Sequence, residues 1–537
     1  MPATKQKKRK TVKGQSKKKP AQTQPRLSGS ASLVLAALGG AALGLSAPGI
    51  DQWYMAWFGL VPLLLLTAAS SGMKEACLRG LVFGTVYHMV YANWYLQLHP
   101  LTWMGFAWWQ SMLVAAAAWI IVSLQQGVIT SLIAVLIRVI PFTGGVMPRT
   151  VEEKWKAPAL LLIPLLWVLM QNKIGNAPDF LGVPWTMVEY SQYKQLGIIQ
   201  CASLIGGIGI SYLIVMSNVA LATVIATFSQ RLSLKSLASA SNNAALTQAL
   251  GVALCITGAV AWGYAHLGTN SKSSSEAISV VQGNVNIEMQ KTTKPMSLSE
   301  LVSHYERLVA KTPPGICIWT ESALPTYLKE EKETLSELAQ LSKDGKRDMI
   351  IGSLDKDFDG KPYNSAFGLA SNGKLAEGIY HKRYLVPFGE YMPAFVHYLP
   401  DWIQKLTSTP AGVGFNAGKV PVVLDLSGHK IAPLICFETL SPELAVSSVR
   451  NGGTLLVNLS DLAWFHDSIC GDQMIAFSVL RAVETDRYFV FAANTGPSAV
   501  IDNHGRIVAR SELGKETVLK SKVLFNSERT AFTDWFN

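Results

Sequence analysis

The sequence has little charge for its length. Only 15% of its 537 residues are Asp, Glu, Lys or Arg, whereas 49% are hydrophobic. A soluble globular protein has about 25% charged residues. The composition therefore argues against an ordinary soluble protein and indicates that a large part of the chain is embedded in a membrane.

Closely spaced cysteines are also absent. The chain has six cysteines, and none forms a C-x-x-C pair or another spacing typical of metal ligands. We therefore expect no disulfide framework, no zinc or other metal site and no cofactor. Three cysteines lie in the apolar half, Cys317 is expected to pack within a strand, and Cys470 lies in a loop or at a helix start; the apolar three are Cys77, Cys201 and Cys255.

Acidic residues are missing from the N-terminal segment. Residues 1–26 contain ten Lys or Arg and no Asp or Glu, so almost all of the net charge of +11 lies there. We expect residues 1–29 to be a disordered basic tail in the cytoplasm. Nucleic-acid binding is the alternative, but an apolar segment follows at once, and positive residues beside a span mark the cytoplasmic side. We therefore predict no nucleic-acid partner.

Seven apolar stretches follow, which predict a transmembrane helical domain over residues 30–267. A span needs about 20 apolar residues. The stretch 104–138 is longer and could be one tilted helix or a hairpin turning at Gln125, whereas 157–171 is short and contains two prolines. The seven stretches are 30–48, 52–70, 80–98, 104–138, 157–171, 196–227 and 244–266.

Loop charges predict the orientation of these spans. Basic residues gather in alternate loops, which fits seven spans with the N-terminus inside and the chain after residue 267 outside the cytoplasm. A cleaved signal peptide is the alternative for the first stretch, but the bundle would then lose a helix. The basic loop residues are Lys74, Arg79, Arg138, Arg149, Lys154, Lys156, Arg231 and Lys235.

The composition changes after residue 267. A polar linker, 268–276, leads into residues 277–525, where short β-rich runs alternate with helical patterns. This alternation predicts a layered α/β domain large enough for its own core. Expected strands are 277–283, 315–321, 348–354, 364–370, 420–426, 430–436, 453–460, 487–494 and 498–503. Expected helices are 297–311, which opens with a Ser297–Glu300 capping box, 331–343, 441–450 and 470–485.

Three residues at predicted strand ends form a candidate reaction centre. Cys436 ends the run KIAPLIC before a helix, Glu321 ends ICIWTE, and Lys382 follows GIYH. A helix N-terminus aimed at the thiol is expected to lower its pKa and favour the thiolate. A thiol, a carboxylate and an amine are the groups that nucleophilic acyl chemistry needs.

The order of these residues resembles the Glu-Lys-Cys triad of the nitrilase superfamily. Five motifs flank them: WTESALP, HKRYLVPFGEYMP, LICFETLSPE, VNLSDLAWFHDS and AANTGPSAVID. These motifs resemble the periplasmic domain of the bacterial apolipoprotein N-acyltransferase family, and GVPWTMVEYSQY resembles its membrane half. The similarity covers roughly residues 30–530.

The resemblance implies an αββα sandwich outside the cytoplasmic (inner) membrane and a two-step acyl transfer. Cys436 would take an acyl chain from a phospholipid as a thioester, and the α-amine of a diacylglyceryl-modified cysteine of an apolipoprotein would then accept it. Glu321 would be the general base, and Lys382 would stabilise the intermediate. We expect a monomer embedded in the bilayer.

Further residues near the triad are candidates for supporting roles. The resemblance implies that Glu390, in the FGEYMP loop beside Tyr391, and Glu438 are needed for activity. A capping role is the alternative for both, because an acid near a helix N-terminus is favourable in itself.

A second set of candidates concerns lipid access. The aromatic-rich segment 394–406, which contains Trp402, could lie at the lipid headgroups and admit acyl chains. Trp464 and Phe465 could form a second wall. Ordinary packing on the domain is the alternative for these aromatic residues.

The sequence also departs from the family pattern. Thr320 replaces a usual proline, Phe437 replaces a tyrosine after the nucleophile, and residues 284–295 lack a usual tryptophan. The tail 526–537 shows no apolar run of membrane length, where the family usually has a final span.

Two other functions remain open. One is a membrane-tethered amidase or nitrile hydrolase with the same triad, which would have little use for seven spans and a lipid-facing lid. The other is a transporter or lipid-binding protein, against which the scarcity of ionisable residues in the spans argues.

Overall fold

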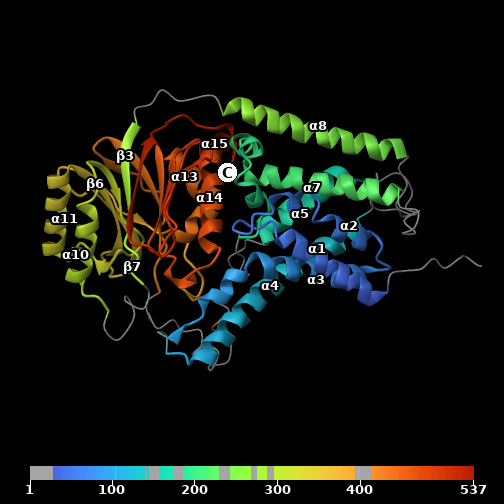
Figure 1. Ribbon diagram of the computed structural model, residues 1–537, viewed down its shortest axis with the longest axis horizontal. Coiled ribbons are helices and arrows are strands. Elements are labelled where there is room, and N and C mark those ends of the chain that lie inside the picture. The colour runs from blue at the N-terminus through green and yellow to red at the C-terminus, as the bar shows by residue number, and fades with distance from the viewer. Residues whose placement is uncertain are drawn as a thin grey trace, which may run out of the picture.

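A computed structural model describes residues 28–102, 105–140, 142–143, 157–174, 185–228, 242–267, 275–286, 295–392, 396, 398 and 414–536. The N-terminal half is helical and the C-terminal half is an α/β domain, and the two halves lie against each other (Figure 1). The expected division into a helical part and an α/β part is therefore confirmed.

The helical half follows the apolar stretches of the sequence. The stretch 104–138 forms one continuous helix, α4, rather than a hairpin. Helix α5 continues through Pro164, whereas α7 is kinked at Gly206, where φ is +68°. The helices are α1 (Gly29–Gly44), α2 (Val61–Ala68), α3 (Met73–Tyr91), α4 (Trp108–Val139), α5 (Ala159–Leu169), α6 (Leu196–Ile199), α7 (Ala202–Phe228) and α8 (Asn242–His266), and the two-residue strands β1 (Phe142–Thr143) and β2 (Ala157–Pro158) pair beside α5.

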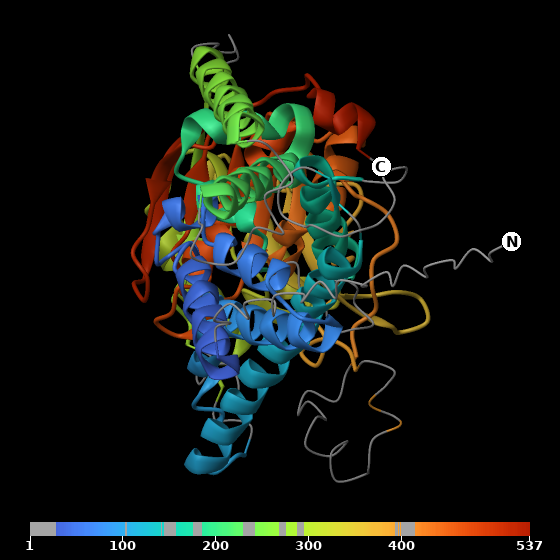
Figure 2. The same ribbon diagram turned by 90° about the vertical axis from the view of Figure 1, so that its right-hand side faces the viewer.

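Three of the described helices are long and apolar enough to cross a membrane: Trp108–Val139, Ala202–Phe228 and Asn243–His266. Three further apolar segments are shorter: Gly29–Gly44, Trp53–Ala68 and Ala159–Ile174. Helix α8 lies at the margin of the helical half (Figure 2), and only 11% of its most apolar segment is buried. The number of spans and their orientation stay predictions.

The α/β domain is built from two sheets that pack face to face. The first has the order β15-β3-β4-β6-β7-β8, with β5 beside β6, and α10 and α11 cover its outer face. Its elements are β3 (Ser275–Gln282), β4 (Gly315–Ile318), β5 (Leu324–Tyr327), β6 (Arg347–Lys356), β7 (Pro362–Leu369), β8 (Tyr380–His381), β15 (Thr517–Leu524), α10 (Leu298–Val309) and α11 (Lys332–Gly345).

The second sheet has the order β14-β13-β12-β11-β10-β9, and α13 and α14 cover its outer face. Alternate residues of both sheets fill the space between them, among them Ile318, Ile350, Val457 and Val490. The layers are thus helix, sheet, sheet, helix, as expected (Figure 1). The elements are β9 (Leu424–Leu426), β10 (His429–Ile435), β11 (Leu455–Ser460), β12 (Phe489–Ala493), β13 (Ala499–Ile501), β14 (Ile507–Arg510), α13 (Pro442–Arg450) and α14 (Cys470–Thr485).

The predicted elements of this domain are largely confirmed. All four helices form within a few residues of their expected bounds, and the Ser297–Glu300 capping box is present. Every expected strand forms, although β4 already ends at Ile318 and β9 is shorter than expected. The sequence analysis missed β5, β14 and β15, which are short or alternate too weakly in polarity.

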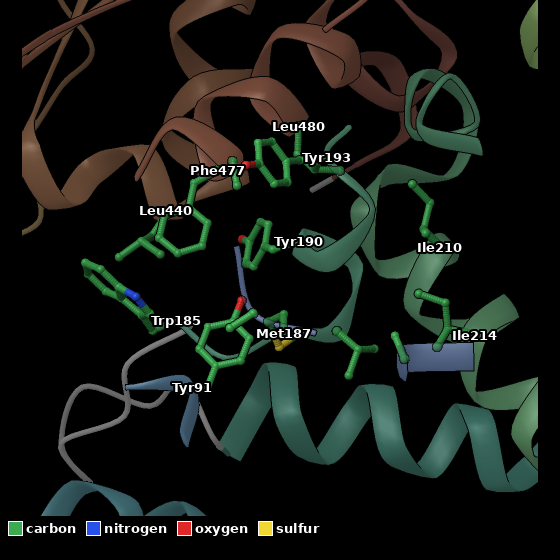
Figure 3. Packing of buried hydrophobic residues seen from close by; sticks show 14 of the residues in the cluster. Tyr91, Trp185, Met187, Tyr190, Tyr193, Ile210, Ile214, Leu440, Phe477 and Leu480 are labelled. Atoms are coloured by element: carbon green, nitrogen blue, oxygen red, sulfur yellow. The ribbon is translucent and has the colours of Figure 1, made fainter. Parts of the chain in front are cut away.

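Helix α14 joins the two halves because it is buried on every side. One face packs on the second sheet. The other face meets the helical half, where Phe477 and Leu480 contact a cluster that includes Tyr190 (Figure 3). The short C-terminal helix α15 (Ala531–Trp535) closes the same boundary, since Phe532 packs against Gly206 at the kink of α7.

Candidate functional site

Cys436 lies at the turn where β10 ends and a 3-10 helix, Cys436–Leu440, begins. Its φ is +51°, a left-handed conformation that is rare for a residue with a side chain. Such strained positions cluster at functional sites. The amide Nδ2 of Asn458 on the neighbouring strand donates a 3.0 Å hydrogen bond to the Cys436 carbonyl and supports the turn.

Glu321 lies three residues beyond the end of β4, in a turn that passes close to strand β6. A Cβ on Gly352 would lie 2.2 Å from the Thr320 carbonyl oxygen, so only glycine allows this approach. Glu321 is 8% exposed, and its Oε2 accepts a 2.9 Å hydrogen bond from the backbone N–H of Asp461. The carboxylate is thus held at a fixed place in the site.

Lys382 follows β8 and is 1% exposed. Its Nζ lies 3.1 Å from Glu321 Oε1 and 2.9 Å from the carboxylate of Glu390. The charges of Glu321 and Lys382 both act on the thiol of Cys436, which lies close to them. The structure therefore brings together the three residues that the sequence placed at strand ends, in one buried cluster.

The charges of this cluster set the protonation states. Burial raises the pKa of the Cys436 thiol well above its usual value, and the negative charge of Glu321 raises it further, while Lys382 opposes the shift. Burial alone would lower the pKa of Lys382, but the carboxylates of Glu321 and Glu390 outweigh it and hold the ammonium charged.

The expectation of a thiolate favoured by a helix N-terminus is therefore wrong. Only a short 3-10 turn follows Cys436, and desolvation of the sulfur dominates. A neutral thiol at Cys436 would need a base beside it before it could attack an acyl group.

Glu390 belongs to the cluster, whereas Glu438 acts at a distance from it. Glu390 contacts Lys382 and accepts a 2.9 Å hydrogen bond from the N–H of Val386. Glu438 is fully buried and accepts hydrogen bonds from one hydroxyl and three backbone N–H groups; these donors are Tyr380 Oη and the N–H groups of Arg383, Tyr384 and Ile435. It ties the loop that carries Lys382 to the end of β10.

The aromatic candidates differ in position. The ring of Phe437 lies 5.9 Å from Trp185 of the helical half and 5.3 Å from Tyr384. Tyr391 lies in the FGEYMP turn, where its carbonyl accepts a 2.8 Å hydrogen bond from the N–H of Phe388. Trp464 is half-buried beside Phe465.

Trp402 lies outside the described residues. Of the predicted lid 394–406, the structure describes only Val396, which is buried, and Tyr398, which is 89% exposed. The role of the lid therefore stays a prediction.

Sequence reasoning missed several residues that shape the site. Asn364 contacts both Glu321 and Glu390, and Asn458 supports the nucleophile turn. Both lie inside strands that were identified by their apolar residues, so a buried polar residue within a strand was the available signal. Among the described residues, no group of three or more His, Cys, Asp or Glu side chains could hold a metal ion.

Aromatic rings of both halves meet beside the nucleophile turn. Trp185 contacts Trp94 at 4.7 Å and Phe477 at 5.2 Å, and Trp94 contacts Phe465 at 5.0 Å. The indole N–H of Trp185 also donates to Gln473 on α14. The residue that follows Cys436, Phe437, therefore packs beside aromatic rings of the helical half.

Helix α14 links the nucleophile turn to α7 through a buried ion pair. Arg481 lies 2.8 Å from Glu484 and donates a 3.3 Å hydrogen bond to the Leu440 carbonyl. Glu484 in turn accepts a 2.8 Å hydrogen bond from the N–H of Gly207 in α7. The position of the turn after Cys436 thus depends on the helical half.

Known proteins match both halves of the chain. Residues 39–220 match the apolipoprotein N-acyltransferase N-terminal domain, and residues 278–530 match the carbon-nitrogen hydrolase family. An apolipoprotein N-acyltransferase of Geobacter metallireducens is 33% identical, over 91% of this chain and 89% of the relative.

Two more distant relatives carry the same name. That of Nitrosomonas europaea is 28% identical over 76% of this chain and 79% of its own, and that of Gloeobacter violaceus is 28% identical over 88% and 84%. The catalytic domain therefore has the nitrilase-like fold, and the chain belongs to the apolipoprotein N-acyltransferase family.

Proposed function

We propose that the chain transfers an acyl chain from a phospholipid to the α-amine of the diacylglyceryl-modified N-terminal cysteine of an apolipoprotein. The observation that carries the proposal is the buried Lys382, in contact with Glu321 and Glu390, close to Cys436 on a strained turn beside the helical half. The names of the relatives support the reaction class.

In the first step Glu321 takes the thiol proton while the sulfur attacks the ester carbonyl of the phospholipid. The charged Lys382 faces the developing oxyanion. When the C–O bond breaks, Glu321 returns the proton to the leaving alcohol oxygen. The products are a Cys436 thioester and a lysophospholipid.

In the second step the amine of the acceptor attacks the thioester carbonyl. Glu321 takes a proton from the attacking nitrogen, the C–S bond breaks, and the proton passes to the departing sulfur. An amide forms, and the neutral thiol is restored. A single acid and a single cation thus serve both half-reactions, and the two substrates use the site in turn.

The setting of the reaction is part of the proposal. The basic tail and the alternation of loop charges support seven spans, with the α/β domain outside the inner membrane of a bacterium. We propose that the chain acts as a monomer, because one chain supplies every residue of the proposed site. The apolar rings around Phe437 suit acyl chains better than the small polar substrates of an amidase.

Intact-mass spectrometry of the detergent-solubilised chain tests the proposal. Phospholipid without acceptor should add one fatty-acyl mass that hydroxylamine removes, and a diacylglyceryl-cysteine peptide should then carry the acyl group as an amide. Cys436→Ala should gain no mass. If wild-type protein never retains the acyl group and only free fatty acid accumulates, the chain is a hydrolase.

A further inference from the structure

Asn364 on β7 is the neutral side chain that contacts both carboxylates of the site. Its Nδ2 donates one hydrogen bond of 2.8 Å to Glu321 Oε1 and another of 2.9 Å to Glu390 Oε1. Its own carbonyl accepts a 2.8 Å hydrogen bond from the N–H of Lys382. One residue thus touches each charged member of the cluster.

The orientation of the Asn364 amide follows from chemistry. Both N–H groups are used on carboxylates, which can only accept hydrogen bonds when ionised. A flipped amide would point its oxygen at two negative charges. Because the N–H groups face the carboxylates, the oxygen Oδ1 points away from them and is buried without a hydrogen-bond partner among the described residues. Both N–H groups of the Asn364 side chain thus bond to carboxylates, although this orientation leaves its oxygen without a hydrogen bond in the described structure.

The charges of the cluster explain why the Asn364 side chain contacts both carboxylates. Two carboxylates share one ammonium group, so the cluster has a surplus negative charge. Lys382 and Asn364 both donate to Oε1 of Glu321, and the N–H of Asp461 donates to Oε2. These three donors hold the Glu321 carboxylate in one orientation close to Cys436.

We propose that Asn364 is a positioning residue for thiol activation, which keeps the Glu321 carboxylate directed at Cys436 while Glu390 lies beside it. Loss of its N–H groups would let the Glu321 carboxylate turn away from the thiol. The inference rests on the proposed function only in the role of Glu321 as the base.

The test measures acylation of Cys436 by p-nitrophenyl butyrate, an activated ester that needs no lipid recognition. The burst of p-nitrophenol is followed from pH 5 to 9 in wild type, Asn364→Ala and Asn364→Asp. Asn364→Asp has nearly the same shape but replaces the donating amide with a third carboxylate, so it separates charge from packing. Asn372→Ala, on an exposed turn, is the control.

We expect the burst rate at pH 7 to fall at least tenfold in Asn364→Ala and further in Asn364→Asp. The fall should be present across the whole pH range in both variants, while Asn372→Ala should stay within twofold of wild type. A rate that does not fall, or that falls no further in Asn364→Asp than in Asn364→Ala, would overturn the inference.

Folding and function are controlled separately. Thermal unfolding of each variant shows whether a low rate reflects loss of the fold. If one variant unfolds, the better-folded variant decides the test, and its burst rate is measured only for the protein that remains folded. A wild-type burst with the butyrate ester but no acyl transfer from phospholipid would defeat the proposed function and leave the Asn364 test intact.

Discussion

The backbone N–H of Gly207 donates a 2.8 Å hydrogen bond to Glu484 Oε1, across the boundary between the helical half and the α/β domain. Glu484 also pairs with Arg481, which donates to the carbonyl of Leu440 in the turn after the nucleophile. Two hydrogen bonds and one ion pair therefore connect the kinked start of α7 with the turn that follows Cys436.

Glu484→Gln should weaken both this boundary and the site. Arg481 and Glu484 are each 1% exposed, and breaking a buried ion pair costs about 3–5 kcal/mol, less where a neutral amide still accepts a hydrogen bond. Denaturant unfolding in detergent should show a loss of about 2–3 kcal/mol, together with slower thioester formation. Glu512→Gln, whose side chain is 71% exposed, should change neither.

Glu321→Gln and Lys382→Met should change the reactivity of the thiol in opposite directions. The negative charge of Glu321 raises the pKa of Cys436 and Lys382 lowers it. Alkylation by iodoacetamide at pH 7 should therefore be faster in Glu321→Gln and slower in Lys382→Met, each by about tenfold for a shift of one pKa unit. Both variants should lose acyl transfer.

Peptide-level mass spectrometry is needed for this comparison, because Cys77 and Cys255 are also exposed. Their alkylation provides an internal reference in each sample. Equal rates at Cys436 in the two variants would show that the charges do not act on the sulfur.

Glu438→Gln should lower stability more than it changes chemistry. Its two oxygens accept four hydrogen bonds, and the amide nitrogen of glutamine cannot accept the two at one oxygen. Each lost buried hydrogen bond costs about 1–3 kcal/mol, so the melting temperature should drop and Lys382 should be held less firmly. Glu443→Gln, on the exposed side of α13, is the matched control.

Gly352→Ala should abolish activity although it lies outside the reacting groups. The new Cβ would meet the Thr320 carbonyl oxygen at 2.2 Å and the Glu321 Cα at 2.9 Å. The turn that carries Glu321 must then move, at a cost of about 1–3 kcal/mol. In the described part of the chain, a Cβ on Gly414 meets no atom within 4 Å, so Gly414→Ala should leave thioester formation unchanged.

Much of the architecture could be predicted from the sequence because the patterns are local. The capping box at Ser297 begins α10, and the run before Cys436 forms β10 with the turn at its end. The positions of Glu321 and Lys382 after strands placed them at one edge of the domain, where they meet.

The protonation state of Cys436 could not be predicted, because it depends on residues distant in the sequence. Burial by neighbouring elements outweighs the short turn that follows the cysteine. Asn364 escaped notice for a related reason: its partners lie 43 and 26 positions away in the sequence. Contacts between residues on different strands are specified by the packing of the whole core rather than by a local motif.

Helix α14 has no face turned to water, since one side covers the second sheet and the other receives Tyr190, Trp185 and their neighbours. Cutting the chain before β3 to obtain a water-soluble catalytic fragment would remove the helical half that covers one side of α14. Phe477 and Leu480 would then be exposed to water. Such a fragment would aggregate. Biochemical work on this enzyme must therefore begin from the intact chain in detergent or lipid.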